Sequence, residues 1–421
     1  MRGLLLGAFQ AALSAADPLA IVPKHLPAPP RGRTVVVGAG KAAASMASAV
    51  EQHWPREAAL EGVVITRYGH GLPLSRIRVV EAGHPVPDAQ GEAAARETLA
   101  LARSLSEDDL LLVLVSGGGS SLLALPVESV PMEELKAVTR MLLASGAPIQ
   151  DMNVVRKHLS LIQGGRLAAA TRAQVLALVI SDVTGDDPTH IASGPCTADP
   201  STYGDALDVL ARFGVTAPPA VAAHLARGAK GEIPETPKAG DPALARADTR
   251  VIATAHASLA SAAAFVQHRG ITPMILGDSV TGESSEVAKV YAALARQVRQ
   301  HSHPLRPPVA LISGGETTVT LRGKGRGGRC TEFLLSLAIA LEGLADTWAL
   351  ACDTDGIDGS EDNAGAILAP DALARAHAAG LSPKRLLADN DGYGFFGALG
   401  DLVVTGPTRT NVNDFRIIVV R

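Results

Sequence analysis

The sequence predicts an α/β protein of two domains, each with a sheet of buried strands between layers of helices. Its 421 residues allow two or three domains at about 100–200 residues each. Short apolar runs such as 110–115 (LLLVLV) alternate with stretches of helical periodicity such as 89–105, a pattern typical of a parallel sheet covered on both faces. The stretch 228–248 contains three prolines and interrupts this alternation. We place the boundary there, with domains 1–235 and 236–421, and allow for a first helix that packs on the other domain.

The strands are predicted from apolar runs bounded by glycine, proline or charged residues. In the first domain they are expected at 34–37, 63–66, 78–81, 110–115 and 175–180. In the second they are expected at 250–254, 271–276, 308–312, 347–352 and 402–405, with helices at 258–268 and 283–300.

Two segments resemble targeting or membrane sequences. The N-terminal stretch 1–20 has Arg2, an apolar run and small residues, as a signal peptide does. Gln10 interrupts the apolar run, so we favour a first helix that ends at the Asp17–Pro18 step. Residues 110–127 carry no charge and match a membrane span in length, but three glycines lie in their middle. We interpret them as a strand, a glycine loop and a helix.

The composition excludes several classes of protein. Lys and Arg number 38 and Asp and Glu 42, so the net charge of −4 predicts no basic surface for nucleic acid or an anionic membrane. Cys196, Cys330 and Cys352 have no metal-site spacing, which argues against zinc and disulfides and for a cytoplasmic location. Aromatic residues make up only 3%, whereas 42 residues are glycine. This excess raises the question of what approaches the backbone at the glycines.

The first glycine cluster follows the first strand. Gly38, Gly40 and Lys41 belong to GAGKAA, which fits the G-x-G-x-x-A fingerprint of dinucleotide sites. The acidic residue expected about 20 positions later is absent, and Thr66 and Arg67 stand there instead. A lysine in the first turn of a helix is unfavourable for the helix dipole unless an anion binds beside it. We therefore read Lys41 as a phosphate or carboxylate contact, with an exposed lysine as the alternative.

The second cluster, SGGGSS at Ser116–Ser121, follows the strand at 110–115. Its successive backbone N–H groups can form an anion-binding nest; a plain strand-to-helix turn is the alternative. The cluster lacks the G-x-S-x-G spacing of a hydrolase nucleophile, because Leu122 replaces the last glycine.

Two polar groups follow in the first domain. Asn153 and Lys157 are four residues apart and share a helix face, which could bind an acidic substrate or be merely solvated. Asp182 and Asp187 follow the strand at 175–180. Their carboxylates could hold Mg²⁺, take a proton or cap a helix.

The densest pattern lies in the second domain, where SGGETT at 313–318 leads into RGKGRGGR at 322–329. Four glycines there are interleaved with four cations. A polyphosphate suits such a segment, because glycine admits the backbone and Arg and Lys neutralise charge; a flexible surface loop is the alternative. Asp353 and Asp355 follow another predicted strand and could bind a metal ion or a ribose. A polar loop with Asn411 and Asn413 follows the strand at 402–405.

Nearly every predicted strand thus ends in a glycine, aspartate or cation cluster. Ligands of open α/β sheets bind outside the carboxyl ends of the strands. Cationic loops with aspartates indicate phosphoryl transfer assisted by Mg²⁺, in which catalysis is mostly positioning and charge neutralisation. The histidines show no metal spacing, so no zinc site is expected.

The sequence closely resembles the class II glycerate kinases, the family with a C-terminal MOFRL domain. The resemblance covers essentially the whole chain and rests on long motifs. They are GAGKAAASMA at Gly38, GHPVPD at Gly83, LVSGGGSSLL at Leu114, NVVRKHLSLIQGGRLA at Asn153, SDVTGDDPTHIASGP at Ser181, SGGETTVTLRGKGRGGRCTE at Ser313, DTDGIDG at Asp353 and GDLVVTGPTRTNVND at Gly400. Cys330 departs from the family, which usually has Asn there, and this puts a contact of that side chain in doubt.

The resemblance implies a Rossmann-like, three-layer N-terminal domain, a second α/β (MOFRL) domain and an active site in the cleft between them. It implies ATP-dependent phosphorylation of D-glycerate, usually at the 2-hydroxyl, although 2- and 3-phosphorylation stay open. The expected partners are ATP and D-glycerate, and neither nucleic acid nor a membrane is expected to bind. A homodimer is a possible assembly.

The resemblance maps a catalytic lysine onto Lys41 and a catalytic arginine onto Arg329, with Arg326 as second choice. We expect these cations to neutralise the transferring phosphoryl group, Asp187 to orient the attacking hydroxyl, and Mg²⁺ to be held by Asp182, Asp187 or Asp353. The acceptor is expected on Ser116, Gly117, Gly118, Gly119, Ser120, Asn153 and Lys157. The nucleotide is expected on Gly38, Gly40, Gly314, Gly315, Glu316, Thr317, Lys324, Gly327, Gly328, Asp355, Asn411 and Asn413. Because aromatic rings are few, aliphatic and backbone contacts are expected to hold adenine.

Two other classes of function compete with the kinase. An NAD(P)H-dependent hydroxypyruvate reductase is favoured by GAGKAA and Arg67, but it lacks the acidic ribose ligand and has no role for the cationic loop. A non-catalytic sensor of nucleotides or sugar acids would be stabilised by its ligand without turnover.

Overall fold

The computed structural model describes all 421 residues and divides into two compact units. The N-terminal unit is Pro18–Ile252, and the C-terminal unit is Ala253–Arg421 together with Met1–Asp17. This division differs from the predicted 1–235 and 236–421. The reason is that the strand expected to open the second domain, β6, is instead the last strand of the first sheet.

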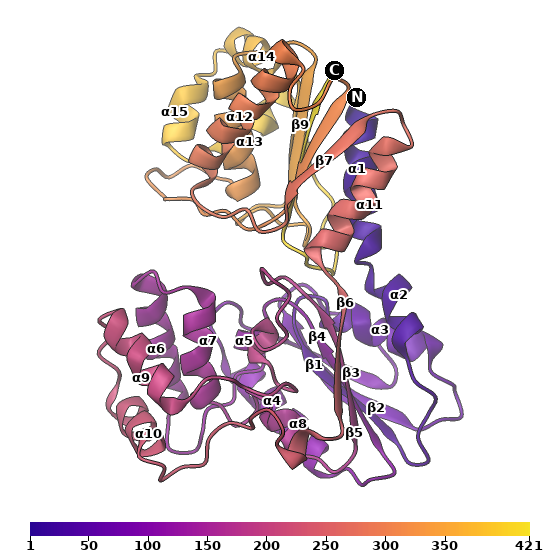
Figure 1. The fold of residues 1–421 in the computed structure, drawn as a ribbon, viewed down its shortest axis with the longest axis vertical. Helices are drawn as coiled ribbons and strands as arrows, with labels where there is room; N and C mark the ends of the chain where they lie inside the picture. The colour runs from indigo at the N-terminus through magenta and orange to yellow at the C-terminus, as the bar shows by residue number, and fades with distance from the viewer. The chain divides into compact units, whose positions relative to one another are not determined.

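The N-terminal unit contains a six-stranded sheet in the order β3-β2-β1-β4-β5-β6, the strand order of the Rossmann fold (Figure 1). The strands are β1 (Thr34–Ala39), β2 (Leu60–Arg67), β3 (Ile77–Ala82), β4 (Leu110–Val115), β5 (Gln174–Ile180) and β6 (Ala247–Ala253). Strands β1 to β5 pair in parallel, and every residue of β1 and β4 is buried. The predicted α/β class is confirmed. The strand order reverses between β1 and β4, which is where ligands of such sheets bind.

The helices of this unit pack around the sheet and in one separate group. They are α2 (Pro18–Ile21), η1 (Val22–His25), α3 (Ala43–His53), α4 (Ala89–Arg103), α5 (Gly119–Leu122), α6 (Met132–Ala144), α7 (Ile149–His158), α8 (Arg166–Ala169), η2 (Ile191–Ser193), α9 (Tyr203–Arg212), α10 (Pro219–Ala229) and η3 (Pro242–Leu244). Helices α6, α7, α9 and α10 lie together and share an apolar core around Tyr203 (Figure 1). Asp88 starts α4 by accepting a hydrogen bond from the Gly91 N–H.

The C-terminal unit has a mixed six-stranded sheet in the order β11-β10-β9-β12-β8-β7. The strands are β7 (Thr272–Gly277), β8 (Val309–Ser313), β9 (Thr347–Asp353), β10 (Gly365–Leu368), β11 (Leu402–Val403) and β12 (Asp414–Val420). Neither β10 nor β12 is among the strands expected from the sequence. Strand β12 lies between β8 and β9 and is antiparallel to both, so the sheet is not the parallel one that the alternation of strands and helices predicts.

The first helix, α1 (Arg2–Ala15), belongs to the C-terminal unit and packs against α11 (Ala255–Gln267). Their contact is close, because a Cβ at Gly7 would overlap the ring of Phe265. The prediction of a helix that ends before Pro18 is confirmed. The other helices are α12 (Ser284–His301), α13 (Arg329–Leu341), α14 (Ala372–Ala378), α15 (Pro383–Ala388) and α16 (Gly392–Leu399).

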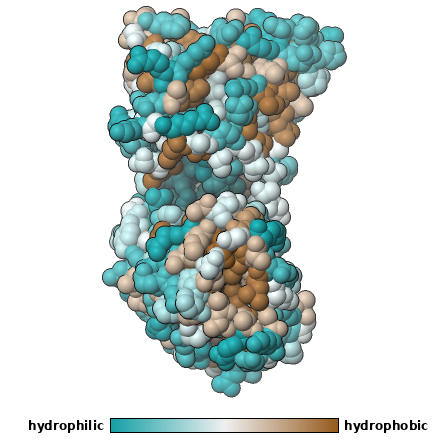
Figure 2. Space-filling model, turned by 90° about the vertical axis from the view of Figure 1, so that its left-hand side faces the viewer, coloured by the Kyte–Doolittle hydropathy of each residue, from teal (hydrophilic) through white to brown (hydrophobic).

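Apolar side chains gather mainly inside the units, in clusters against the two sheets and between helices. Hydrophilic side chains cover much of the face seen in Figure 2, with smaller hydrophobic areas between them. No single helix has the length and hydropathy to cross a membrane; only the bent pair formed by α1 and Pro18–His25 meets both criteria together. Within α1, the apolar residues Leu5, Phe9 and Leu13 are buried.

Candidate active site

The loops after β1 and β4 are joined at the point where the strand order reverses. The Lys41 N–H donates to the Gly117 carbonyl at 2.8 Å, and the Ala42 N–H donates to the Ser116 hydroxyl at 3.0 Å. A Cβ at Gly40 would overlap Ser116. Gly40 therefore admits the neighbouring loop, and the Ser116 hydroxyl holds the two loops together. Lys41 lies just before α3, beside this junction.

The glycine loop turns into α5 at Gly118. This residue has a left-handed backbone (φ 82°), and a Cβ there would lie 3.0 Å from the imidazole of His84. The His84 ring nitrogen Nδ1 is 2.7 Å from the Ser121 hydroxyl. His84 was not among the predicted site residues, although the GHPVPD motif contains it. The structure places it against the predicted acceptor loop.

A buried hydrogen-bond network joins two predicted acceptor residues. Asn153 on α7 donates to the His190 carbonyl at 3.0 Å, and its Oδ1 lies 3.1 Å from the Ser193 hydroxyl. The Ser193 hydroxyl is also 3.0 Å from that of Ser120. Ala192 and Ser193 both have left-handed backbones (φ 49° and 58°), a conformation that costs free energy in residues other than glycine and clusters at functional sites.

Lys157 has a different environment from the one predicted. Its side chain is 1% exposed, and its Nζ lies 2.7 Å from a carboxylate oxygen of Asp199. Ser201 and Thr236 also donate to this carboxylate. Burial alone would raise the pKa of Asp199, but the Lys157 ammonium and these hydrogen bonds hold it below its usual value. The ammonium is thus held inside the unit by Asp199, and a contact of Lys157 with the acceptor stays a prediction.

The aspartates after β5 are better placed to meet a ligand. Asp187 is exposed, and its Oδ1 accepts a hydrogen bond from the Thr189 N–H at 2.9 Å. Partial burial would raise the pKa of Asp187, but the hydrogen bonds from Thr189 lower it overall, so the carboxylate is ionised at neutral pH. Asp182 is half-buried in the same loop.

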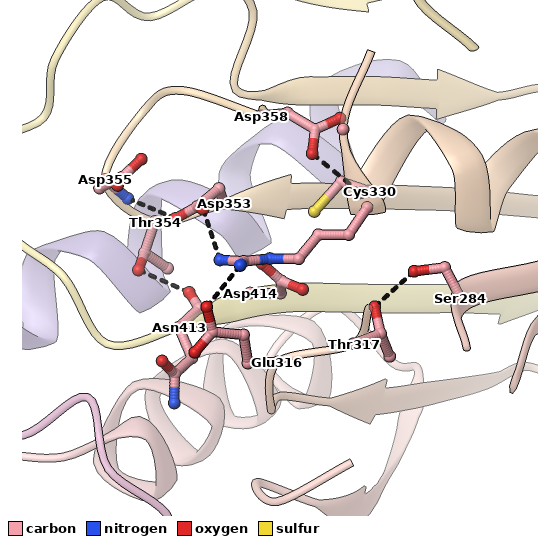
Figure 3. Close-up of polar contacts among 12 residues, drawn as sticks. Ser284, Glu316, Thr317, Cys330, Asp353, Thr354, Asp355, Asp358, Asn413 and Asp414 are labelled. Atoms are coloured by element: carbon pink, nitrogen blue, oxygen red, sulfur yellow. Dashed lines mark hydrogen bonds and ion pairs between the residues drawn. The ribbon is translucent and has the colours of Figure 1, made fainter. Parts of the chain in front are cut away.

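In the C-terminal unit three carboxylates surround one guanidinium (Figure 3). Arg329 donates through Nε to Asp414 at 2.7 Å, through Nη2 to Asp353 at 2.7 Å and through Nη1 to Glu316 at 2.5 Å. Burial alone would lower the pKa of Arg329, but the three carboxylates raise it. The predicted catalytic arginine is therefore the centre of an ionic cluster, and its remaining donors are few.

The glycines of the cationic loop approach the protein's own backbone. A Cβ at Gly323 or Gly325 would overlap the segment 389–391. The loop donates its N–H groups to that segment: Arg322 to Asn390 at 2.7 Å, Lys324 to Asp389 at 3.0 Å and Arg326 to Asp391 at 3.2 Å. The expectation that these glycines bring backbone against phosphate is not supported. The side chains of Arg322, Lys324 and Arg326 nevertheless point outward and are exposed.

The N-terminus of α13 already holds a carboxyl group of the chain. The fully buried carboxylate of Asp358 accepts the N–H groups of Cys330 and Thr331, each at 2.9 Å. Gly328 is required there because a Cβ would overlap Asp358. Burial raises the pKa of the Cys330 thiol, which packs in the apolar core of this unit. Its side chain therefore contacts core residues.

Other predicted nucleotide residues lie just after the carboxyl end of β8 and are used in packing. Thr317 is buried and bonded to Ser284 at 2.6 Å and to Arg416 at 3.0 Å. Arg416, which the sequence analysis does not single out, is fully buried on β12. A Cβ at Gly315 would overlap Val280. The remaining polar residues form turns: Asp355 accepts the Ile357 N–H, Asn411 accepts the Asn413 N–H, and the Asn413 carbonyl accepts the Thr354 hydroxyl.

Glu332 on α13 is an acid whose pKa burial alters strongly. It is 5% exposed, and Asn390 donates to it at 3.4 Å. Burial raises the pKa of Glu332 to about 7. Asn390 also accepts the N–H groups of Arg322 and Gly323, so it connects Glu332 to the cationic loop.

The first prediction concerns Lys157→Met. Removing the ammonium leaves the Asp199 carboxylate buried without its partner, which costs about 3–5 kcal/mol. We expect urea unfolding to show this loss of stability, whereas Lys230→Met, at an exposed site in the same unit, has little effect. A stable K157M protein with a raised KM would contradict the structural role.

The second prediction concerns Glu332→Gln. The folded state keeps the Glu332 proton up to about pH 7, whereas the unfolded chain loses it near its ordinary pKa of 4.5. Stability contributed by this group therefore falls as pH rises through that window. We expect E332Q to match the wild type in urea unfolding at pH 5 and to exceed it at pH 8 by about 2 kcal/mol. The exposed Glu342 gives the control E342Q, and an equal difference at both pH values would refute the effect.

Comparison with known proteins covers both units. A family model described as a domain of unknown function, DUF4147, matches residues 4–226, and a MOFRL family model matches residues 309–414. The D-glycerate 2-kinase of Thermotoga maritima is 39% identical over 419 residues, covering 99% of this chain and 98% of that protein. A protein of Agrobacterium vitis named "Putative hydroxypyruvate reductase" is 50% identical over 422 residues, covering 100% and 94%.

A solved structure agrees with these sequence relationships. The crystal structure of a Thermotoga maritima glycerate kinase matches the chain with a TM-score of 0.88 and 38% identity, covering 100% of this chain and 99% of that one. With its DUF4147 and MOFRL regions and its whole-length relatives, the chain belongs to the class II glycerate kinase family.

Proposed function

We propose that the protein is an ATP-dependent kinase that phosphorylates D-glycerate at its 2-hydroxyl. The whole-length likeness to the D-glycerate 2-kinase of Thermotoga maritima carries this proposal. The cationic loop supports it, because Arg322, Lys324 and Arg326 are exposed on a backbone that the segment 389–391 holds in place. Such fixed cations suit a triphosphate, whose transfer depends on charge neutralisation.

The residues present fit a nucleotide with Mg²⁺. No three acidic, histidine or cysteine side chains converge as a ready-made metal site, but Mg²⁺ usually takes one or two carboxylates together with substrate phosphates. Asp187, exposed and ionised, is our first choice for such a ligand, with Asp182 and Asp353 as the other candidates. When bound, Mg²⁺ would neutralise charge on the phosphate oxygens.

The roles of individual side chains follow from their surroundings. Lys41 would offset the negative charge of the transferring phosphoryl group from the junction of the β1 and β4 loops. Asp187 would accept a hydrogen bond from the attacking hydroxyl and orient it. Arg326 becomes the better candidate for direct phosphate contact, because its side chain is 61% exposed and pairs only with Glu361, whereas Arg329 is held by three carboxylates. Arg329 would position Asp353 and Glu316.

A hydroxypyruvate reductase is the second candidate, favoured by the name of the Agrobacterium vitis relative and by the Rossmann strand order. Against it, β2 ends in Thr66 and Arg67 and not in the acid that binds ribose. NADPH oxidation with hydroxypyruvate, measured beside ADP release with D-glycerate, separates the two. Phosphorus NMR of the product then distinguishes 2- from 3-phosphorylation. A cytoplasmic location, which the three buried free thiols suit, and a homodimer stay predictions.

The third prediction tests the proposed role of Lys41. Lys41→Met removes a cation that acts on the charge of the transition state, so kcat should fall about 10²- to 10³-fold with a smaller change in the KM for D-glycerate. The exposed Lys24 gives the matched control K24M. Initial rates of ADP release measure both variants. A K41M enzyme with near wild-type kcat would exclude this role.

A further inference from the structure

Arg156 on α7 carries a charge that no residue of the chain neutralises. Its Nη1 donates to Asn153 Oδ1 at 3.2 Å, and it forms no ion pair. Asn153 is neutral and already bonded to Ser193. The neighbouring Lys157, in contrast, is matched by Asp199.

Arg156 also lines a small pocket in the N-terminal unit. The pocket has a volume of about 10 Å³, room for one water-sized atom. Its polar lining residues are Arg156, Gln163 and the hydroxyl-bearing Ser120, Ser121, Thr139 and Ser160, and its apolar ones are Pro87, Ala124, Leu125 and Leu135. Gln163 already donates to the Ser120 carbonyl at 2.8 Å. Ser121 and Ser160 already donate their hydroxyl protons to the carbonyls of Gly118 and Leu125. The pocket thus offers the Arg156 cation without a carboxylate among its lining residues.

The electrostatics favour an anion at this place. Burial lowers the pKa of Arg156 to about 10, and no acid acts to raise it again. Arg156 is half-buried and still charged at neutral pH, so water solvates this cation only in part. An unpaired, partly buried charge costs free energy, and a bound anion would offset that cost. Because guanidinium and carboxylate match in shape and charge, Arg is well suited to recognise a carboxylate through two parallel hydrogen bonds.

We infer that Arg156 binds the carboxylate of the hydroxy-acid acceptor, with one carboxylate oxygen entering the pocket beside Ser120 and Ser121. The inference deepens the proposed function and rests on it for the identity of the acid. It also reassigns the acceptor cation, because Lys157, expected in this role, is held by Asp199. Arg156 is next to Lys157 in the chain but faces the pocket.

Binding and kinetics together test this assignment. Thermal shift is measured with D-glycerate and with glycerol, which lacks the carboxylate, each with and without Mg-ADP. We expect D-glycerate to raise the Tm of the wild type and not that of R156Q, and glycerol at equal concentration to shift neither. In the ADP-release assay the KM for D-glycerate should rise about 10- to 100-fold in R156Q, with a much smaller change in kcat and in the KM for ATP. The exposed Arg140 on α6 gives the matched control R140Q.

Each outcome decides the inference. The inference is overturned if R156Q keeps the wild-type Tm shift or the wild-type KM for D-glycerate. It is also overturned if D-glycerate does not raise the Tm of the wild type. If R156Q fails to fold, R156K is measured in its place, because lysine keeps the charge but cannot form the two parallel hydrogen bonds. A raised KM of R156K for D-glycerate supports the assignment, and an unchanged KM overturns it. A wild type that releases no ADP, yet is stabilised by D-glycerate through Arg156, supports the carboxylate site and removes the kinase proposal.

Discussion

The close contact between the loops after β1 and β4 is the constraint on which the N-terminal unit depends. Gly38 and Gly40 lie so near the backbone of Leu114 and Ser116 that no side chain fits between them. Hydrogen bonds then join the two loops, so Lys41 has a defined place at the junction. The turn into α5 starts from the same junction, and the network of Ser120, Asn153 and Arg156 is assembled against it.

In the C-terminal unit, ion pairs hold the loops after the strands in place. Asp353, Asp414 and Glu316 would repel one another without Arg329 between them. Asp358 closes the start of α13 in a similar way. Acidic side chains thus hold the structure in place, while the cations of the loop at 322–326 remain exposed. The backbone of this segment is thus held in place while its cationic side chains stay exposed, although Arg326 also pairs with Glu361.

The glycine excess has a different cause from the one that the sequence suggested. The expectation was that backbone at the glycines approaches phosphate. At Gly40 the approaching group is Ser116, at Gly325 it is the segment 389–391, and at Gly328 it is Asp358. Glycine clusters at strand ends therefore mark places where the chain packs against itself, and the ligand would meet the side chains that such packing holds outward.

Helical periodicity explains one success and one failure at the candidate site. The four-residue spacing of Asn153 and Lys157 correctly places both on one face of a helix. Spacing does not say whether that face points to solvent or to the interior, and here both side chains are 1% exposed. Arg156, one position away, lines the small pocket. The sequence shows the three residues side by side, and only the surrounding elements distinguish their roles.

The sequence by itself determined the α/β class, most strands of both sheets and the family, because hydrophobic runs and long motifs are local properties of the chain. Tertiary structure alone decided that β6 joins the first sheet and that β12 inserts between β8 and β9. It also decided which charges are paired. Arg329 meets Asp414 across 85 positions of sequence, and Arg156 meets no acid at all. No local pattern encodes such pairings, because they depend on which distant segments the packed sheets and helices bring together.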